Sequence, residues 1–355
     1  MHRPSLLCSL WLVMLPACTE DPMGEGTSTP WGPSTTEAGD TLAPTSDEDT
    51  TAGDTSASTS IGTSADTTAG DEDPGTTGEP ECIRPDPSPT WMAPLQQDVV
   101  ARLSGAAEVS PGVVLSDRAS PGNRAATLDF LLEQWDAMGL EGTLHPYSAT
   151  GTNVYVALPA AIETDLTVVI GAHFDSVPGC PGANDNATGV AMVLSLSRWL
   201  DAIPCRELNV ILVLFDEEEI GLVGSQAFAS WLVEQSFDVH SVHTIDQMGW
   251  DGDGDRTLEL ERADEGLFEL YEAAEPLAPG NTPLTPTNTG FTDHVSFREL
   301  GFPAIGLTEE YVSGDTTPHY HLPSDTFDTV DLDYLGSSTA LLHVTLGQLV
   351  APTAR

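Results

Sequence analysis

The sequence predicts an α/β fold: a three-layer αβα sandwich with a mostly parallel central sheet, folded as a single domain over residues 91–352. Two observations predict this class. Short apolar runs alternate with amphipathic segments along that region, which is typical of a parallel sheet covered by helices. One run, Leu208–Phe215, is apolar at almost every position, as expected for a strand that is buried on both faces.

The predicted elements follow one another in a regular order. Asn123–Met138 has apolar residues at helical spacing and is followed by Gly139, a common helix stop. The other predicted helices are Thr188–Leu200, Gly224–Val233, Glu265–Ala274, Thr292–Leu300 and Leu332–Leu349. The predicted strands are Asn153–Leu158, Leu166–Ala172, Leu208–Phe215, Val242–Met248, Thr257–Glu261 and Pro303–Leu307.

Residues 1–18 have the pattern of an export signal, with a basic start and an apolar run that is too short to span a bilayer. Its end, Leu15-Pro16-Ala17-Cys18, resembles a bacterial lipobox, so we expect cleavage before Cys18 and lipidation of that cysteine. Thr19 follows, where an inner-membrane retention signal has Asp, and this favours an outer-membrane or cell-surface lipoprotein. An ordinary signal peptide, leaving a soluble secreted protein, is the alternative.

Residues 19–90 repeat Thr, Ser, Gly, Asp, Glu and Pro with few large apolar side chains. Such a segment cannot bury enough surface to offset the entropy of ordering, so we predict a disordered acidic tether. A flexible chain of this kind has a root-mean-square reach of roughly 40–50 Å. Its predicted role is to hold the folded domain away from a membrane.

The charge of the chain is strongly negative. It has 55 acidic and 11 basic residues, a formal net charge of −44, and no lysine. Nucleic acids and anionic lipids are bound through clustered positive charge, so neither is expected as a partner. The predicted lipid anchor is then the only link to a membrane.

Histidine and carboxylate residues follow the ends of successive predicted strands, where parallel sheets place their ligand sites. Each motif taken singly is weak evidence, because acidic runs are usually solvated and Asn-Asp-Asn is usually a turn. Several carboxylates gathered at one edge of a sheet would repel one another unless cations compensate their charge. The segments are His173–Asp175, Gly182–Gly189, Asp216–Gly221, Asp246–Gly249 and His319–Thr326.

These segments resemble the M28 family of zinc aminopeptidases, which use two co-catalytic metal ions. The resemblance covers about Asp117–Leu349, with all motifs in the family's order. It implies an exo-acting hydrolase that cleaves N-terminal residues from peptides, and the export signal predicts that these peptides lie outside the cytoplasm. The motifs are His173-x-Asp175, Gly182-Ala183-Asn184-Asp185-Asn186-Ala187-x-Gly189, Glu218-Glu219-x-Gly221-Leu222-x-Gly224-Ser225, Asp246-x-Met248-Gly249, Thr292-Asp293-His294-x-x-Phe297 and His321-x-x-x-Asp325-Thr326.

The resemblance implies a ligand for each of two zinc ions. His173 and Asp246 would hold one ion, and Glu219 and His321 the other. Asp185 would bridge both. Imidazole and carboxylate ligands suit Zn²⁺, and three carboxylates against two dications leave a net charge of +1 that favours an anionic intermediate.

The resemblance also implies roles beside the ligands. Glu218 would be the general base, and Asp175 would orient the ring of His173. A one-residue slip in the acidic run would make Glu217 the base, but the downstream Ile220–Ser225 segment favours Glu218.

Three further residues lie near the predicted site. Asp293 and His294 match a segment that lines the family's substrate pocket. His319 is two residues before His321, and we prefer His321 as the ligand because the His-x-x-x-Asp-Thr pattern begins there. The pocket loops do not reveal which side chain the enzyme prefers.

Asp251-x-Asp253-x-Asp255 resembles the start of a calcium-binding loop. Arg256 occupies the sixth position and Arg262 the twelfth, where an EF-hand has Gly and Glu. We therefore expect a surface acidic loop rather than a calcium site.

Cys82, Cys180 and Cys205 remain once the signal peptide is removed and Cys18 is lipidated. The predicted helix Thr188–Leu200 is about 20 Å long and separates Cys180 from Cys205. We therefore predict a Cys82–Cys205 disulfide and a free Cys180.

Two alternative functions stay open. A related glutaminyl cyclase would share the fold and hold a single zinc ion. The second alternative is an inactive surface binding module on the same fold. The complete set of predicted ligands, together with Glu218, argues against it.

Overall fold

The described residues form a mixed sheet of eight strands in the order β1-β2-β4-β3-β5-β8-β6-β7. The computed structural model describes residues 82–355 except 265, 313, 353 and 355. The strands are β1 (Thr143–Pro146), β2 (Thr152–Leu158), β3 (Leu166–His173), β4 (Asn209–Phe215), β5 (Asp238–Asp246), β6 (Leu258–Glu261), β7 (Leu284–Thr287) and β8 (Ala304–Thr308). The helices are α1 (Met92–Leu103), α2 (Pro121–Ala137), α3 (Gly189–Asp201), α4 (Val223–Glu234), α5 (Leu267–Ala274), α6 (His294–Glu299) and α7 (Leu332–Val350), with short helical turns η1 (Ala183–Thr188), η2 (Glu275–Leu277) and η3 (Phe327–Thr329).

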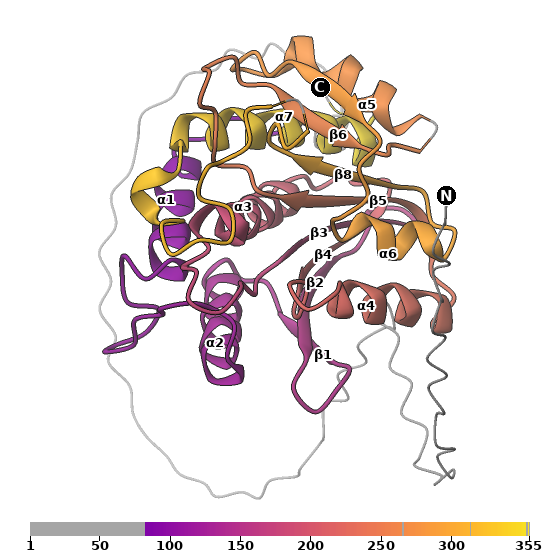
Figure 1. Ribbon diagram of the computed structural model, residues 1–355. Helices are drawn as coiled ribbons and strands as arrows, with labels where there is room; N and C mark the ends of the chain where they lie inside the picture. The colour runs from indigo at the N-terminus through magenta and orange to yellow at the C-terminus, as the bar shows by residue number, and fades with distance from the viewer. Residues whose placement is uncertain (1–81, 265, 313, 353, 355) are drawn as a thin grey trace, which may run out of the picture. The chain divides into compact units, whose positions relative to one another are not determined.

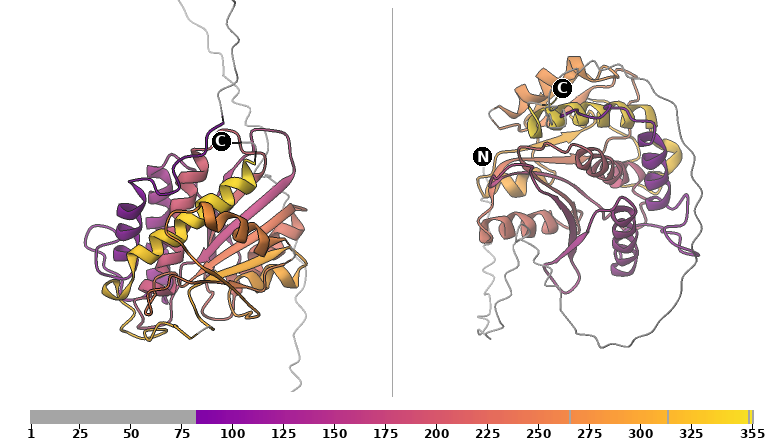
Figure 2. Two further views of the ribbon diagram at one scale, coloured as in Figure 1. Left: turned by 90° about the horizontal axis from the view of Figure 1, so that it is seen from above. Right: turned by 180° about the vertical axis from the view of Figure 1, so that it is seen from behind.

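The middle of the sheet is parallel: β4, β3, β5 and β8 run side by side in the same direction. The edges are mixed, because β1 and β2 pair antiparallel, β2 is antiparallel to β4, and β6 is antiparallel to β8. Helices α1, α2, α3 and α7 cover one face, and α4 and α6 cover the other (Figures 1 and 2). The predicted α/β sandwich with a mostly parallel sheet is confirmed.

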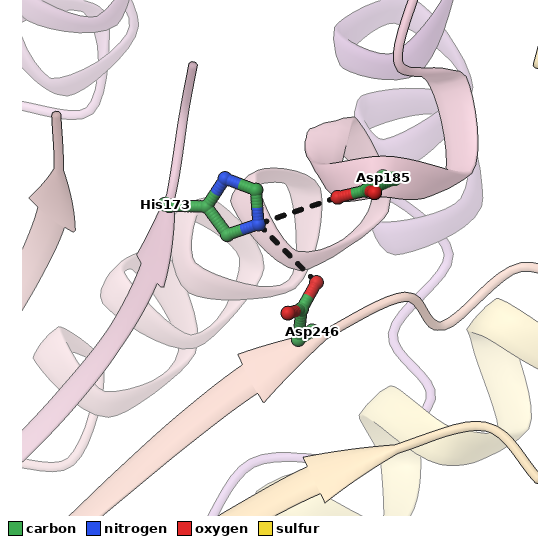
Figure 3. Close-up of side chains that lie close together, drawn as sticks. All are labelled: His173, Asp185 and Asp246. Atoms are coloured by element: carbon green, nitrogen blue, oxygen red, sulfur yellow. Dashed lines mark hydrogen bonds and ion pairs between the residues drawn. The ribbon is translucent and has the colours of Figure 1, made fainter. Parts of the chain in front are cut away.

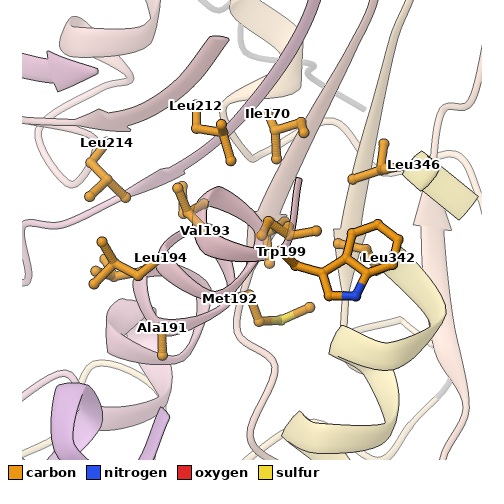
Figure 4. Close-up of a cluster of buried hydrophobic side chains, with 14 of the residues drawn as sticks. Ile170, Ala191, Met192, Val193, Leu194, Trp199, Leu212, Leu214, Leu342 and Leu346 are labelled. Atoms are coloured by element: carbon orange, nitrogen blue, oxygen red, sulfur yellow. The ribbon is translucent and has the colours of Figure 1, made fainter. Parts of the chain in front are cut away.

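The two faces of the central strands are both apolar because successive side chains point in opposite directions. Ile170 and Leu212 pack against Val193 of α3 (Figure 4). Their neighbours in sequence, including Val213, pack on the opposite face against Phe228 of α4. Burial on both sides explains the unbroken apolar run of β4, whose residues are all buried. This rigid centre fixes the strand ends that carry the candidate site.

Some element boundaries differ from the predictions. The first helix, α1, and the edge strands β1 and β7 were not predicted; β1 is short and largely exposed, so its sequence has no apolar alternation. Strand β5 starts at Asp238, earlier than expected. The helix expected over Thr292–Leu300 is only α6, His294–Glu299.

Residues 82–90 pack on the domain, so the predicted boundary at residue 91 is too late. The Trp199 indole N–H donates to the Asp86 carbonyl at 2.8 Å, and His343 Nδ1 lies 2.7 Å from the Pro87 carbonyl. The predicted signal peptide, the lipidation of Cys18 and the tether up to residue 81 lie outside the described residues. No helix in the described part of the chain is both long and apolar enough to cross a bilayer.

The predicted disulfide is confirmed. Cys82 is bonded to Cys205, with Cα atoms 5.9 Å apart, and ties the start of the domain to the segment after α3. Cys180 is free and buried.

Candidate metal centre

Two neighbouring parallel strands and one loop bring the first group of donor atoms together. His173 is the last residue of β3, and Asp246 is the last residue of β5. Asp185 comes from the turn that precedes α3. The Nε2 atom of His173 lies 3.3 Å from Asp185 Oδ1 and 3.3 Å from Asp246 Oδ1 (Figure 3).

A second group of donor atoms lies around Oδ2, the other carboxylate oxygen of Asp185. His321 Nε2 lies 3.2 Å from Asp185 Oδ2 and 3.0 Å from Glu219 Oε2. Glu219 follows the end of β4, the strand next to β3. The five residues predicted as ligands are thus gathered around Asp185, and the two histidines face its two different oxygens.

The chemistry of this donor set fits divalent metal ions. Within each group the donor atoms lie within 4.8 Å of one another, close enough to share one ion. Burial and nearby carboxylates raise the pKa of Glu219 to about 8, which shows that negative charge is costly there without a cation. Glu219 Oε1 is also buried, and no described residue forms a hydrogen bond with it. Imidazole nitrogen and carboxylate oxygen together suit zinc.

Asp175 supports two of these residues at once. Its Oδ1 lies 3.5 Å from His173 Nδ1, on the side of the ring away from the other carboxylates. The same carboxylate accepts the backbone N–H groups of Glu218 at 3.0 Å and Glu219 at 3.2 Å. One buried side chain therefore orients the ring and the acidic turn after β4.

Neighbouring glutamates in that turn face different surroundings. Glu218 lines the cavity at the donor groups, and burial, aided by Asp293 and Asp246, raises its pKa to about 10. Glu217 instead forms an ion pair with Arg124 at 2.8 Å and accepts the Tyr147 hydroxyl at 3.2 Å. Of these two residues, only Glu218 is placed to act on a ligand in the cavity.

Sequence comparison then assigns the family. The profile of peptidase family M28 matches residues 153–346, more than half of the chain. The chain belongs to peptidase family M28.

Individual M28 relatives are aminopeptidases by name. The chain is 28% identical over 196 residues to aminopeptidase YwaD of Bacillus subtilis, covering 54% of this chain and 43% of that protein. It is 28% identical over 210 residues to the probable lipoprotein aminopeptidase LpqL of Mycobacterium tuberculosis, covering 51% of this chain and 42% of that protein. The matches thus span less than half of either relative. The Legionella pneumophila LapA aminopeptidase has a similar fold, with a TM-score of 0.65 and 21% identity, covering 73% of this chain and 70% of that chain.

Two carboxylates that the M28 resemblance does not name as ligands hold the turn carrying Asp185. Asp325 accepts the N–H groups of Asn184 at 2.8 Å and Asp185 at 3.1 Å. Glu309, at the end of β8, is fully buried and accepts the Asn184 side-chain amide at 3.0 Å and the Trp250 N–H at 2.8 Å. Glu309 was not predicted as a site residue, and its only signal in the sequence is its place after a predicted strand.

A buried arginine supports the same turn and was also missed. Arg118 is fully buried and donates to the carbonyls of Leu103 at 2.8 Å, Pro181 at 2.7 Å and Gly182 at 2.9 Å. It lies upstream of the first strand motif, in a segment without periodicity. Its guanidinium therefore joins the end of α1 to the segment between His173 and Asp185.

The residues predicted to line the pocket are buried behind its wall. Asp293 and His294 are buried and do not line it; Phe291 and Thr292, just before them, do. The reason is that α6 begins at His294 and packs its first residues inward. His319 lies 3.0 Å from the Ser324 hydroxyl and belongs to neither donor group around Asp185.

The acidic loop Asp251–Asp255 brings three carboxylates within 4.8 Å of one another. Each accepts a backbone N–H of its own loop: Asp251 from Arg256, Asp253 from Asp255, and Asp255 from Thr257. These hydrogen bonds hold the backbone of the loop in its turn.

Proposed function

We propose that this protein is a di-zinc aminopeptidase that hydrolyses N-terminal residues from peptides outside the cytoplasm. The observation that carries the proposal is the position of Asp185 between the two histidines. His173 and Asp246 would hold one zinc ion, and Glu219 and His321 the other, with one oxygen of Asp185 for each.

The zinc ions would supply activation of a water molecule and polarisation of the scissile carbonyl. Glu218 faces the cavity and would accept the proton of that water and pass it to the leaving amine. Asp175 would keep His173 in the orientation that presents Nε2, and it positions the backbone of Glu218 by accepting its N–H. The excess of negative charge on the chain agrees with attraction of the protonated amine of the substrate.

We further propose that the chain is exported, lipidated at Cys18 and held at the cell surface by residues 19–81. The named similarity to a probable lipoprotein aminopeptidase supports this proposal. Membrane fractionation tests it: the wild type should partition with membranes, and Cys18→Ala should be found in the soluble fraction. Equal partitioning of both proteins would contradict the anchor.

The enzymatic proposal is tested on protein stripped with a chelator and then reloaded with zinc. Aminoacyl-nitroanilides and dipeptides should lose their N-terminal residue only after zinc is restored. Cyclisation of N-terminal glutamine by protein with one zinc ion would support the cyclase alternative instead. No turnover of any substrate by reloaded protein would support an inactive binding module.

A further inference from the structure

The cavity at the metal centre has one acidic residue for which the proposed chemistry has no use. Its lining includes Asp185, Asp246, Glu218 and Glu261. The first two are proposed zinc ligands, and Glu218 is the proposed base. Glu261 is the last residue of β6 and only 1% exposed, yet it forms part of the cavity wall.

Strand register places Glu261 on the same face of the sheet as Asp246. Asp246 is paired with Thr308 of β8, and Thr308 is paired with Glu259 of β6. Paired residues share a face of the sheet, as do residues two apart, so Glu261 lies on the face that carries Asp246. Two strand spacings and two residues along the strand put their Cα atoms roughly 12 Å apart.

The polar side chains around Glu261 include Thr289, Thr292 and His294. Thr292 donates its hydroxyl to Glu261 Oε2 at 2.8 Å. In the described part of the chain, the ion-pair contact recorded for Glu261 is with His294, at 3.6 Å. Burial lowers the pKa of His294 to about 4, so this ring is neutral at pH 7. A buried carboxylate of this kind is costly unless a cation reaches it.

The aromatic walls of the cavity suit an apolar stem. Phe291, Tyr311 and Tyr320 line the cavity, and the rings of the two tyrosines lie 5.9 Å apart. Long basic side chains pack their methylene groups on such surfaces, and their cationic heads are attracted to aromatic rings and carboxylates. A leucine side chain would cover Glu261 without balancing its charge.

We propose that Glu261 determines substrate specificity and that the enzyme prefers peptides with an N-terminal arginine or lysine. This inference rests on the proposed aminopeptidase function. The cationic side chain of the substrate would balance the buried charge of Glu261, which is neither a proposed zinc ligand nor the proposed base.

The test compares kcat/KM for arginine and citrulline nitroanilides, which have nearly the same shape but differ in charge. Zinc-loaded wild type should prefer arginine by roughly 10- to 100-fold, the range for a hydrogen bond to a buried charge. Glu261→Gln should bring the ratio close to one while turnover of leucine nitroanilide is retained. Glu299→Gln removes an exposed carboxylate of α6 and should leave the ratio unchanged.

Equal turnover of arginine and citrulline substrates by the wild type would overturn the inference and leave the aminopeptidase proposal standing. A full arginine preference in Glu261→Gln would overturn it as well. If the zinc-loaded wild type hydrolyses none of the three substrates, the proposed function fails, and the inference fails with it. Melting temperature and zinc content of each variant identify a folding defect, and the wild-type comparison does not depend on any variant.

Discussion

At the scale of single residues, three consecutive glutamates after β4 have three different environments. Glu217 has a backbone φ of 60° and turns its side chain to Arg124. Glu218 faces the cavity, and Glu219 contacts His321. Composition alone does not distinguish the roles of the three glutamates. The downstream motif Ile220–Ser225 does, because it fixes which glutamate occupies each position of the motif.

The two adjacent glutamates make a matched test. Glu218→Gln should lower kcat by about 10²- to 10⁴-fold, the usual contribution of a general base, and should retain the bound zinc. Glu217→Gln should keep kcat close to wild type, because its side chain pairs with Arg124 away from the cavity. Steady-state kinetics and metal analysis of both variants check this. A larger loss of kcat in Glu217→Gln than in Glu218→Gln would show that Glu218 is not the general base.

Other site residues could not be predicted from the sequence. Glu261 ends an ordinary amphipathic strand, and only the antiparallel pairing of β6 with β8 brings it to the cavity. Arg118 and Glu309 have no motif because most of their partners are backbone groups, which every residue type provides. The predicted ligands were recognisable because metal binding demands particular side chains in a particular order.

At the scale of elements, the turn between β3 and α3 depends on groups from outside it. Arg118 reaches it from the chain before α2, and Asp325 from the segment before α7. Both supply hydrogen bonds that the turn cannot make within itself. The helices and strands around the turn were predictable from hydrophobic periodicity. The pairing of the edge strands was not, because periodicity does not show which strands lie next to each other.

Removing the buried guanidinium of Arg118 should lower the stability of the protein. Arg118→Met leaves several buried carbonyls without a donor and should lower the free energy of unfolding by at least about 3 kcal/mol, and it should weaken zinc binding. Arg102→Met is the control, since its ion pair with Asp98 is partly exposed and contributes at most about 1 kcal/mol. Urea unfolding and zinc titration measure both effects. Equal stability of the two variants would show that Arg118 does not support the turn.

At the scale of the whole molecule, the segment 82–90 and α7 close over the end of α3. His343 of α7 stacks on Trp199 of α3, with ring centroids 4.6 Å apart, and its Nδ1 meets the Pro87 carbonyl. The sequence predicts α7 as a helix and residues 82–90 as part of the tether. It does not predict that the two pack together, because residues 82–90 resemble the preceding segment in composition.

This layer should make stability depend on pH. Burial lowers the pKa of His343 to about 4, against 6.5 for an unperturbed ring. Above pH 6.5 the ring of His343 is neutral in both the folded and the unfolded chain, so its titration does not change the free energy of unfolding. Between pH 6.5 and 4 only the unfolded chain takes up the proton, so the free energy of unfolding falls by up to about 1.4 kcal/mol per pH unit.

His343→Phe keeps a ring on Trp199 and removes this titration. Its unfolding free energy should fall less steeply than that of the wild type over the same pH range. Buried His243, with a pKa lowered to about 3, remains and preserves part of the slope. Denaturant unfolding at a series of pH values gives the comparison, and identical slopes would mean that His343 is not buried as a neutral ring.

The central claim is that one carboxylate, Asp185, joins two metal ions held by four other side chains. Anomalous diffraction at the zinc edge, on crystals of zinc-loaded protein, tests it most directly. Two peaks about 3.5–4 Å apart are expected, one beside His173 and Asp246 and the other beside Glu219 and His321. A single peak, or peaks away from Asp185, would contradict it.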